Sequence, residues 1–263
     1  DYFVAAVKGA IINEVENPLI IDITHEIQPY NHTQAAYVLK NTFRSFPEGS
    51  IHIIGVESEK TPENKHIAML FEGHYFIGAD NGILSMIREN FKAEKIVEIN
   101  IHQNVTTTFP VLDIFVKVAA HISRKGQLEV IGKSTKVIKE LTNVNPVVNN
   151  KGDQIVGSVI YVDNYGNVIT NITRKLFQEV RKSRAFTIFA RNIKFKKVVE
   201  TYGEAIDFST PKEKRDEDGK KIALFNSADH LELAIYKSNP QTVGSAYSLF
   251  GLEYREAVTV NFE

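Results

Sequence analysis

Cysteine is absent from this chain of 263 residues. The chain therefore has no disulfide, no thiolate nucleophile and no zinc site built on cysteine, and the composition fits a reducing compartment. Long apolar runs are absent too, since the longest fall far short of the roughly 20 residues that a membrane-spanning helix needs. The N-terminus carries no basic and then apolar signal pattern. These absences predict a cytoplasmic protein that does not enter membranes.

Neither sign of charge is in excess. The 31 Lys and Arg residues face 32 Asp and Glu residues, which gives a formal net charge of -1. Such a balance creates no field that attracts nucleic acid or an anionic membrane surface. We therefore expect no nucleic-acid partner, and the 43% of hydrophobic residues suffice for a folded core.

The motifs of several enzyme classes are missing as well. The chain has no glycine-rich dinucleotide motif, no P-loop, no G-x-S-x-G and no H-E-x-x-H. Its eight histidines are scattered, and no two of them stand four residues apart on a predicted helix. Because metal ligands usually come in such spacings, the sequence predicts no metal site.

Helical and strand patterns alternate over the first half of the chain, which is typical of an α/β domain. The segments that show them are 3–14, 33–46, 81–90 and 113–124 for helices, and 19–24, 50–56, 66–71, 74–79 and 95–100 for strands. Only Glu72 and Gly73 separate two of these strands, so a hairpin and a mixed sheet are expected. The helical pattern begins almost at residue 1, and we expect a first strand to be missing before it.

The pattern changes near residue 150. Segment 140–153 is rich in Asn, Pro and Gly, and it is the predicted linker. Beyond it, short runs of period two are bounded by Asn, Gly or Lys, which predicts strands of a small β-barrel. We therefore expect an α/β domain over 1–145 and a β-barrel domain over 154–263. The charged segment 210–221 should be an exposed loop with a flexible tip.

Five segments carry a resemblance to a known family. They read DITHEI (22–27), FIGADNGILS (76–85), TFPVLDIFVKVAAH (108–121), IYVDNYGNVITNI (160–172) and NSADHLELAI (226–235). In this order they resemble the S-adenosyl-L-methionine hydroxide adenosyltransferase family, which is related to the fluorinases and chlorinases. The resemblance spans nearly the whole chain. It implies an α/β domain, a β-barrel domain, and a homotrimer whose ligand sites lie at the subunit interfaces.

The resemblance also implies residues that bind S-adenosyl-L-methionine or adenosine. Some face the adenine or the nucleophile, and others hold the amino group or the methionine end. They are Tyr30, Thr108, Phe109, Asp163, Tyr165, Asn167, Asn226 and Ser227. Two alternatives stay open: Tyr30 is equally consistent with an ordinary surface tyrosine, and the stretch from Asp163 to Asn167 makes a good hairpin turn on local grounds alone.

The catalytic set that the resemblance implies is altered here. Similar hydrolases have an Asp, an Arg and a His, and the corresponding positions hold Glu57, Lys65 and Pro110. A Glu–Lys pair can orient water through charge-assisted hydrogen bonds, whereas proline has no proton acceptor in its side chain. Asp113 either caps the helix that follows or takes part in catalysis.

Three hypotheses follow. The first is hydrolysis of S-adenosyl-L-methionine to adenosine and L-methionine by attack of water at C5′, with Glu57 and Lys65 as the catalytic residues. The second is a non-catalytic trimer that binds an adenosyl ligand. The third is a halide transferase, although Glu57 would repel an incoming anion. None of them needs a cofactor or a metal, because S-adenosyl-L-methionine is itself the substrate or ligand.

Overall fold

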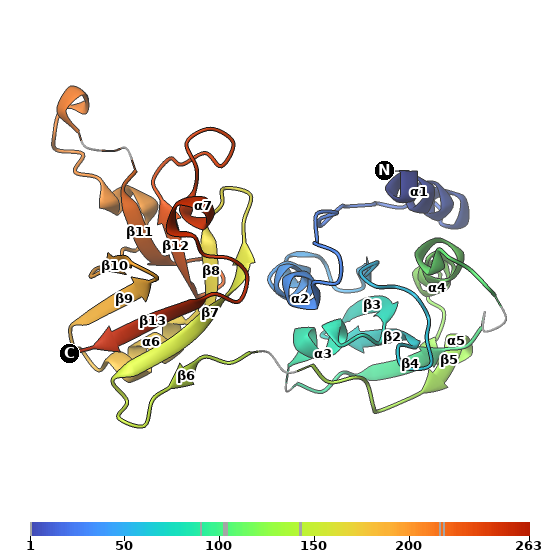
Figure 1. Cartoon of the computed structure of the whole chain (residues 1–263). Coiled ribbons are helices and arrows are strands. Elements are labelled where there is room, and N and C mark those ends of the chain that lie inside the picture. Colours follow the sequence, from blue (N-terminus) through green and yellow to red (C-terminus); the bar gives the residue numbers. More distant parts are fainter. Residues whose placement is uncertain (1, 90, 102–104, 142–143, 216, 218) are drawn as a thin grey trace. The chain divides into compact units, whose positions relative to one another are not determined.

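Figure 1 shows the computed structural model, which describes residues 2–89, 91–101, 105–141, 144–215, 217 and 219–263. The chain divides into two compact units, Asp1–Asn143 and Val144–Glu263. Each unit has its own hydrophobic core and is described by itself. No helix in the described part combines the length and the apolar composition that crossing a bilayer requires.

The first unit is built on a mixed sheet of five strands in the order β1-β3-β2-β4-β5. The strands are β1 (Ile51–Ile53), β2 (His66–Phe71), β3 (His74–Ala79), β4 (Lys95–Ile99) and β5 (Gly132–Ser134). Strands β1 and β3 are parallel, and the other pairs are antiparallel. The predicted hairpin is present as β2 and β3, and the expected mixed sheet is confirmed.

Helices cover both faces of this sheet (Figure 1). They are α1 (Tyr2–Glu14), α2 (His32–Lys40), α3 (Ile83–Arg88), α4 (Val116–Ser123) and α5 (Leu128–Ile131), with a 3₁₀ turn at Phe43–Ser45 and a π-helical turn at Val111–Phe115. Alternate residues of β2 enter different cores: Met69 packs with α2 and α3, and Ala68 packs with α4. Burial on both sides explains why β2 reads as an almost unbroken apolar run.

The predicted strand 19–24 is wrong. This segment has no sheet partner among the described residues, and Leu19 and Ile21 are 88% and 56% exposed. Its composition favours an extended backbone, but a strand also needs a neighbouring strand that accepts its hydrogen bonds. Local sequence cannot supply that neighbour.

The second unit is a nearly closed β-barrel, as expected. Its strands are β6 (Val147–Val148), β7 (Gln154–Val162), β8 (Val168–Thr173), β9 (Phe186–Ala190), β10 (Ile193–Phe195), β11 (Lys221–Phe225), β12 (His230–Ile235) and β13 (Ala257–Phe262). The hydrogen-bonded order is β10-β9-β13-β7-β8-β12-β11, and β6 pairs with β7. A parallel bridge joins Leu224 of β11 to Val199, in the segment that follows β10.

Two short helices complete the barrel unit, namely α6 (Arg174–Arg181) and α7 (Ala246–Phe250). Helix α6 begins at Thr173, whose hydroxyl accepts a hydrogen bond from the backbone N–H of Leu176. Its Phe177 ring makes edge contacts with rings of the barrel core. Neither helix nor β11 follows from the sequence pattern, and β6 lies inside the segment predicted as a linker.

Candidate functional site

Glu57 stands in the loop after β1, and the backbone around it is firmly held. Its φ of +46° lies in the left-handed region, which is uncommon for a residue with a side chain. Asn81 donates from Nδ2 to the carbonyl oxygens of Val56 at 2.9 Å and of Glu57 at 3.4 Å. His66 donates from Nε2 to the carbonyl oxygen of Ser58 at 2.9 Å. The loop is therefore anchored on both sides of Glu57.

The two side chains that hold this loop are themselves buried. Asn81 is 2% exposed, and its Oδ1 also accepts the backbone N–H of Ile83 at the start of α3. Burial lowers the pKa of His66 and so favours its neutral form, which still has the N–H that it donates to the loop. The edge of the His66 ring meets Phe115 in the π-helical turn, with ring centroids 4.8 Å apart. The loop thus rests on the packed core of the unit.

The carboxylate of Glu57 contacts a histidine that sequence reasoning missed. The Nε2 atom of His32 lies 2.5 Å from Oε2 of Glu57. A carboxylate accepts hydrogen bonds, so Nε2 of His32 carries the proton and donates it. The two side chains are 24% and 28% exposed, which leaves them half-buried and within reach of a ligand. His32 opens α2 just after the cap residue Asn31, and nothing in the local pattern marks it as a partner of Glu57.

Lys65 does not join this pair. Its ammonium group lies 2.9 Å from Oε2 of Glu98, and the pair between Glu57 and Lys65 that the sequence suggested is not formed. The reason is the sheet register. Lys65 directly precedes β2, and β4 runs beside β2 with Glu98 opposite Ile67, so the two charges meet across neighbouring strands. Half of the Lys65 side chain is exposed.

Thr108 and Phe109, which the resemblance places near the nucleophile, lie in a tight polar turn before the π-helical turn. The hydroxyl of Thr107 donates to the carboxylate of Asp113, and its oxygen accepts the backbone N–H of Phe109 at 2.8 Å. Asp113 lies inside the first turn, whereas the cap position is taken by Pro110, so Asp113 is not the helix cap. Thr108 is exposed and Phe109 is half-buried.

This turn approaches the loop of Glu57. A side-chain carbon at Gly55 would lie 3.4 Å from Cγ2 of Val111, the first residue of the π-helical turn. In that turn the N–H of Val116 bonds to the carbonyl of Val111, one residue farther than in an α-helix. Such turns occur frequently at functional sites. Tyr30 lies before α2, has a positive φ of 63° and is 75% exposed.

In the barrel unit, Asp163, Tyr165 and Asn167 form the turn between β7 and β8. The Oδ1 atom of Asp163 accepts the backbone N–H groups of Tyr165 at 2.9 Å and Asn167 at 2.8 Å, and Oδ2 accepts Nδ2 of Asn167 at 3.0 Å. These bonds give the turn a local structural basis. Tyr165 is 70% exposed and Asn167 is buried.

Asn226 and Ser227 form a second turn, between β11 and β12. Oδ1 of Asn226 accepts the backbone N–H groups of Ala228 and His230, and Ser227 is exposed. Glu232, a residue that the sequence analysis did not single out, contacts this second turn and lies near the charge of Asp163 in the first. Its carboxylate receives hydrogen bonds from Asn226 and from the hydroxyl of Tyr202. Burial, together with the nearby charge of Asp163, raises the pKa of Glu232.

Both units of the chain match domains of one protein family. Residues 1–132 match the SAM hydroxide adenosyltransferase N-terminal domain, and residues 157–259 match the SAM hydroxide adenosyltransferase C-terminal domain. The chain belongs to the SAM hydroxide adenosyltransferase family. The resemblance drawn from the five sequence segments is thereby confirmed.

Several individual proteins align with this family member over almost the whole length of the chain. The (R)-S-adenosyl-L-methionine hydrolase of Methanocaldococcus jannaschii is 28% identical over 98% of this chain and 90% of its own length. The protein of the same name from Thermus thermophilus is 25% identical over 96% and 92%. A crystal structure of an uncharacterized conserved protein from Thermotoga maritima matches with a TM-score of 0.83 and 27% identity, over 99% of this chain and 95% of that one.

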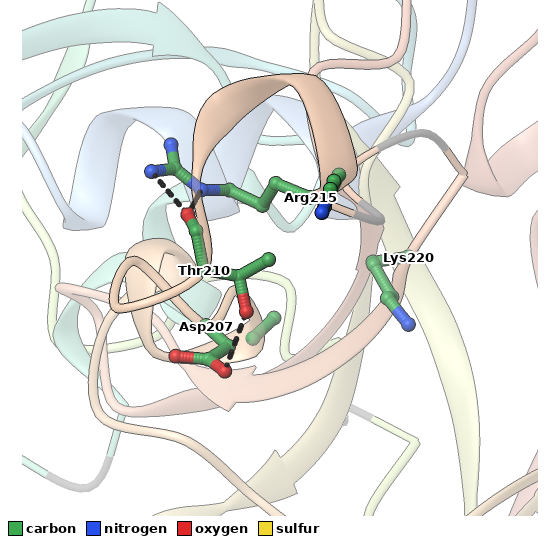
Figure 2. Close-up of a pocket in the computed structure, with 6 residues that line it drawn as sticks. Asp207, Thr210, Arg215 and Lys220 are labelled. Atoms are coloured by element: carbon green, nitrogen blue, oxygen red, sulfur yellow. Dashed lines mark hydrogen bonds between the residues drawn. The ribbon is translucent and has the colours of Figure 1, made fainter.

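A hollow of about 230 Å³ lies in the barrel unit of this adenosyltransferase-family chain. Figure 2 shows residues that line it. Arg215 donates from Nε and Nη2 to the carbonyl of Thr210 at 3.1 and 3.0 Å, and the Thr210 hydroxyl donates to Asp207 at 3.0 Å. Arg215 also pairs with Glu217. These groups satisfy one another, so the charged segment 210–221 is partly packed where the structure describes it and is not simply solvated. The predicted flexible tip includes residues 216 and 218, which lie outside the described residues.

None of the site residues that the resemblance implies lines this hollow. Across the described ranges, no group of three or more histidine, aspartate or glutamate side chains is arranged to hold a metal ion. The predicted site residues thus fall into two groups, one near the Glu57 loop and the polar turn in the first unit, and one in the two turns near Glu232 in the barrel unit.

Proposed function

We propose that the chain hydrolyses S-adenosyl-L-methionine to adenosine and L-methionine. The observation that carries this proposal is the match to both family domains, in order, together with two relatives named as hydrolases of the (R) epimer that align over nearly the whole chain. The half-buried carboxylate of Glu57 supplies a group that can act on water.

The reaction is a direct displacement at C5′ of the adenosyl group. The oxygen of water forms a bond to C5′ while the bond from C5′ to sulfur breaks, and its electron pair leaves with methionine as a neutral thioether. The water gives one proton to the carboxylate of Glu57, which releases it to solvent. Because a sulfonium is already a good leaving group, the main task of the protein is to align and desolvate the water. A loop that is anchored on both sides of Glu57 suits this task.

The proposed substrate contacts lie in both units. We assign the adenine face to exposed aromatic rings and the polar groups of the substrate to the turns. The residues proposed are Tyr30, Thr108 and Phe109 in the first unit, and Asp163, Tyr165, Asn167, Asn226 and Ser227 in the second. Because the Asp163 carboxylate is engaged within its own turn, its contribution includes holding Tyr165 in place.

We further propose the homotrimer that the family resemblance implies, with ligand sites at the subunit interfaces. Light scattering on the purified protein should then give three times the 29.7 kDa chain mass. A monomer mass at the concentration used for activity assays would contradict this assembly.

The direct test of the reaction uses water labelled with ¹⁸O. Each epimer of S-adenosyl-L-methionine is incubated with the protein in chloride buffer, and the products are analysed by mass spectrometry. We expect one ¹⁸O atom in the 5′-hydroxyl of adenosine, together with unlabelled methionine. A 5′-chloro product would indicate a halide transferase instead. Unchanged substrate together with ligand-induced stabilisation would indicate a binding protein.

Lys65→Met tests the second catalytic residue that the sequence suggested. Because Lys65 is exposed and paired with Glu98, we expect adenosine formation to fall by less than roughly tenfold, as for other exposed ion pairs. Initial rates with saturating substrate measure this effect, and Glu98→Gln serves as the matched control for loss of the pair. A loss of more than about 100-fold, the size expected for a group that takes part in proton transfer, would place Lys65 back beside Glu57 during turnover.

A further inference from the structure

His32 has no role among the residues that the family resemblance implies, yet it makes the closest contact to the proposed base. Its Nε2 lies 2.5 Å from Oε2 of Glu57, and the two residues come from different elements, the start of α2 and the loop after β1. No other side chain in the described part of the chain bonds to this carboxylate. His32 is therefore what determines how the carboxylate is turned.

The contact gives the two oxygens of the Glu57 carboxylate different hydrogen bonding. Oε2 accepts the proton of His32, whereas Oε1 makes no hydrogen bond within the described residues. The backbone of Glu57 is held by Asn81, so the remaining freedom of the residue is the rotation of its side chain. One hydrogen bond to Oε2 restricts that rotation and leaves Oε1 as the oxygen available to accept a proton. A base that must meet a single water molecule needs this kind of restriction.

A structural role alone explains the contact poorly. The two side chains keep solvent access, at 24% and 28% exposed, and solvent-accessible ion pairs contribute little to folding stability. The cap of α2 is supplied by Asn31, whose Oδ1 accepts the backbone N–H of Gln34 at 3.0 Å, so the helix does not depend on His32. The same unit holds a comparable pair, His25 with Asp22 at 2.9 Å, in a more exposed place. That pair provides a matched control.

We propose that His32 is a positioning residue for hydrolysis, which holds one oxygen of the Glu57 carboxylate so that the other accepts the proton of the attacking water. This inference rests on the proposed function. In the step, the water proton passes to Oε1 of Glu57 as the C5′–O bond forms, and the proton on Nε2 of His32 stays in the hydrogen bond. No oxidant, reductant or further reactant takes part.

The experiment compares three variants with the unsubstituted parent protein. His32→Phe keeps a ring of similar size but removes the donor, His32→Gln keeps an N–H donor at a similar reach, and His25→Phe removes the comparable pair elsewhere. We expect His32→Phe to lower kcat by about 10- to 100-fold, a size typical of losing a group that orients a reacting group. KM should stay within about threefold, since substrate contacts are unchanged. His32→Gln should recover most of kcat, and His25→Phe should match the parent.

Thermal melting of each variant controls for folding. Equal kcat in His32→Phe and the parent would overturn the inference and leave the hydrolase proposal intact. A kcat that falls equally in His32→Phe and His32→Gln, or falls together with the melting temperature, would also overturn it, because the donor would then not be what matters. If the parent protein itself forms no adenosine, the proposed function fails and the inference fails with it.

Discussion

Replacement of Glu57 by glutamine is expected to lower kcat for adenosine formation by on the order of 10²- to 10⁴-fold, the usual contribution of a general base. Glutamine has nearly the same size and can still accept the hydrogen bond of His32, but its amide cannot take a proton from water. Substrate contacts and the anchored loop remain, so KM should change little. Single-turnover formation of ¹⁸O-labelled adenosine measures the effect on the chemical step.

Glu59→Gln is the matched control for this experiment. Glu59 is exposed on the same loop and makes no side-chain bond within the described residues, so the same change of charge there should leave kcat within about twofold, as for surface substitutions away from special features. A full rate in Glu57→Gln would show that water is aligned without this base. Equal losses in both variants would instead point to the net charge of the loop.

Acidification is expected to destabilise the first unit through a buried histidine pair that has no part in the site. His52 on β1 and His74 on β3 are 6% and 3% exposed, and their rings are joined by a hydrogen bond of 3.2 Å. Burial, with a smaller contribution from His74, lowers the pKa of His52 from 6.5 to about 4. The unfolded chain therefore binds a proton on His52 at a higher pH than the folded chain does.

The sign and size of the effect follow from that difference in pKa. Between pH 6.5 and pH 4 the unfolded state carries more protons, so the free energy of unfolding decreases as the pH falls, by a total of roughly 3 kcal/mol. Above pH 6.5 both states are neutral at this residue and the contribution is constant. Urea unfolding followed by circular dichroism at pH 7.5, 6.0 and 5.0 measures the change.

His52→Phe separates this residue from other groups that titrate in the same range. The ring stacks on Phe76 and meets Phe43 edge-on, so phenylalanine fits the same aromatic surroundings. Loss of the bond to His74 should cost about 1 kcal/mol at pH 7.5. The variant should then lose stability on acidification less steeply than the parent protein. Identical pH slopes in the two proteins would contradict the assignment to His52.

The altered catalytic positions acquire a different meaning in the folded chain. Where similar hydrolases are identified by Asp, Arg and His, this chain has Glu57, Lys65 and Pro110, and those letters alone suggest an impaired site. In the structure, Glu57 is paired with an imidazole after all, because α2 brings His32 to it. Proline at position 110 opens the π-helical turn, a place that suits its missing N–H.

Local signals in the sequence were sufficient for the elements that they encode directly. The hairpin of β2 and β3 is one example, since two apolar runs flank Glu72 and Gly73, and both residues adopt the positive φ that a tight hairpin turn requires. Strands β7 and β13 are another, because alternation of buried and less buried residues is a property of each strand by itself. The family assignment likewise depended on segments of contiguous residues.

The tertiary structure alone decided which side chains meet. Segment 19–24 has the composition of a strand but no sheet partner among the residues that the structure describes. Lys65 pairs with Glu98 because of the register of β2 and β4. His32 and Glu57 are 25 positions apart, and their contact depends on where α2 packs and on the left-handed backbone at Glu57. Composition, periodicity and motifs describe neighbours along the chain. The pairing of a carboxylate with its donor is instead determined by packing between distant elements, and no local pattern in the sequence records it.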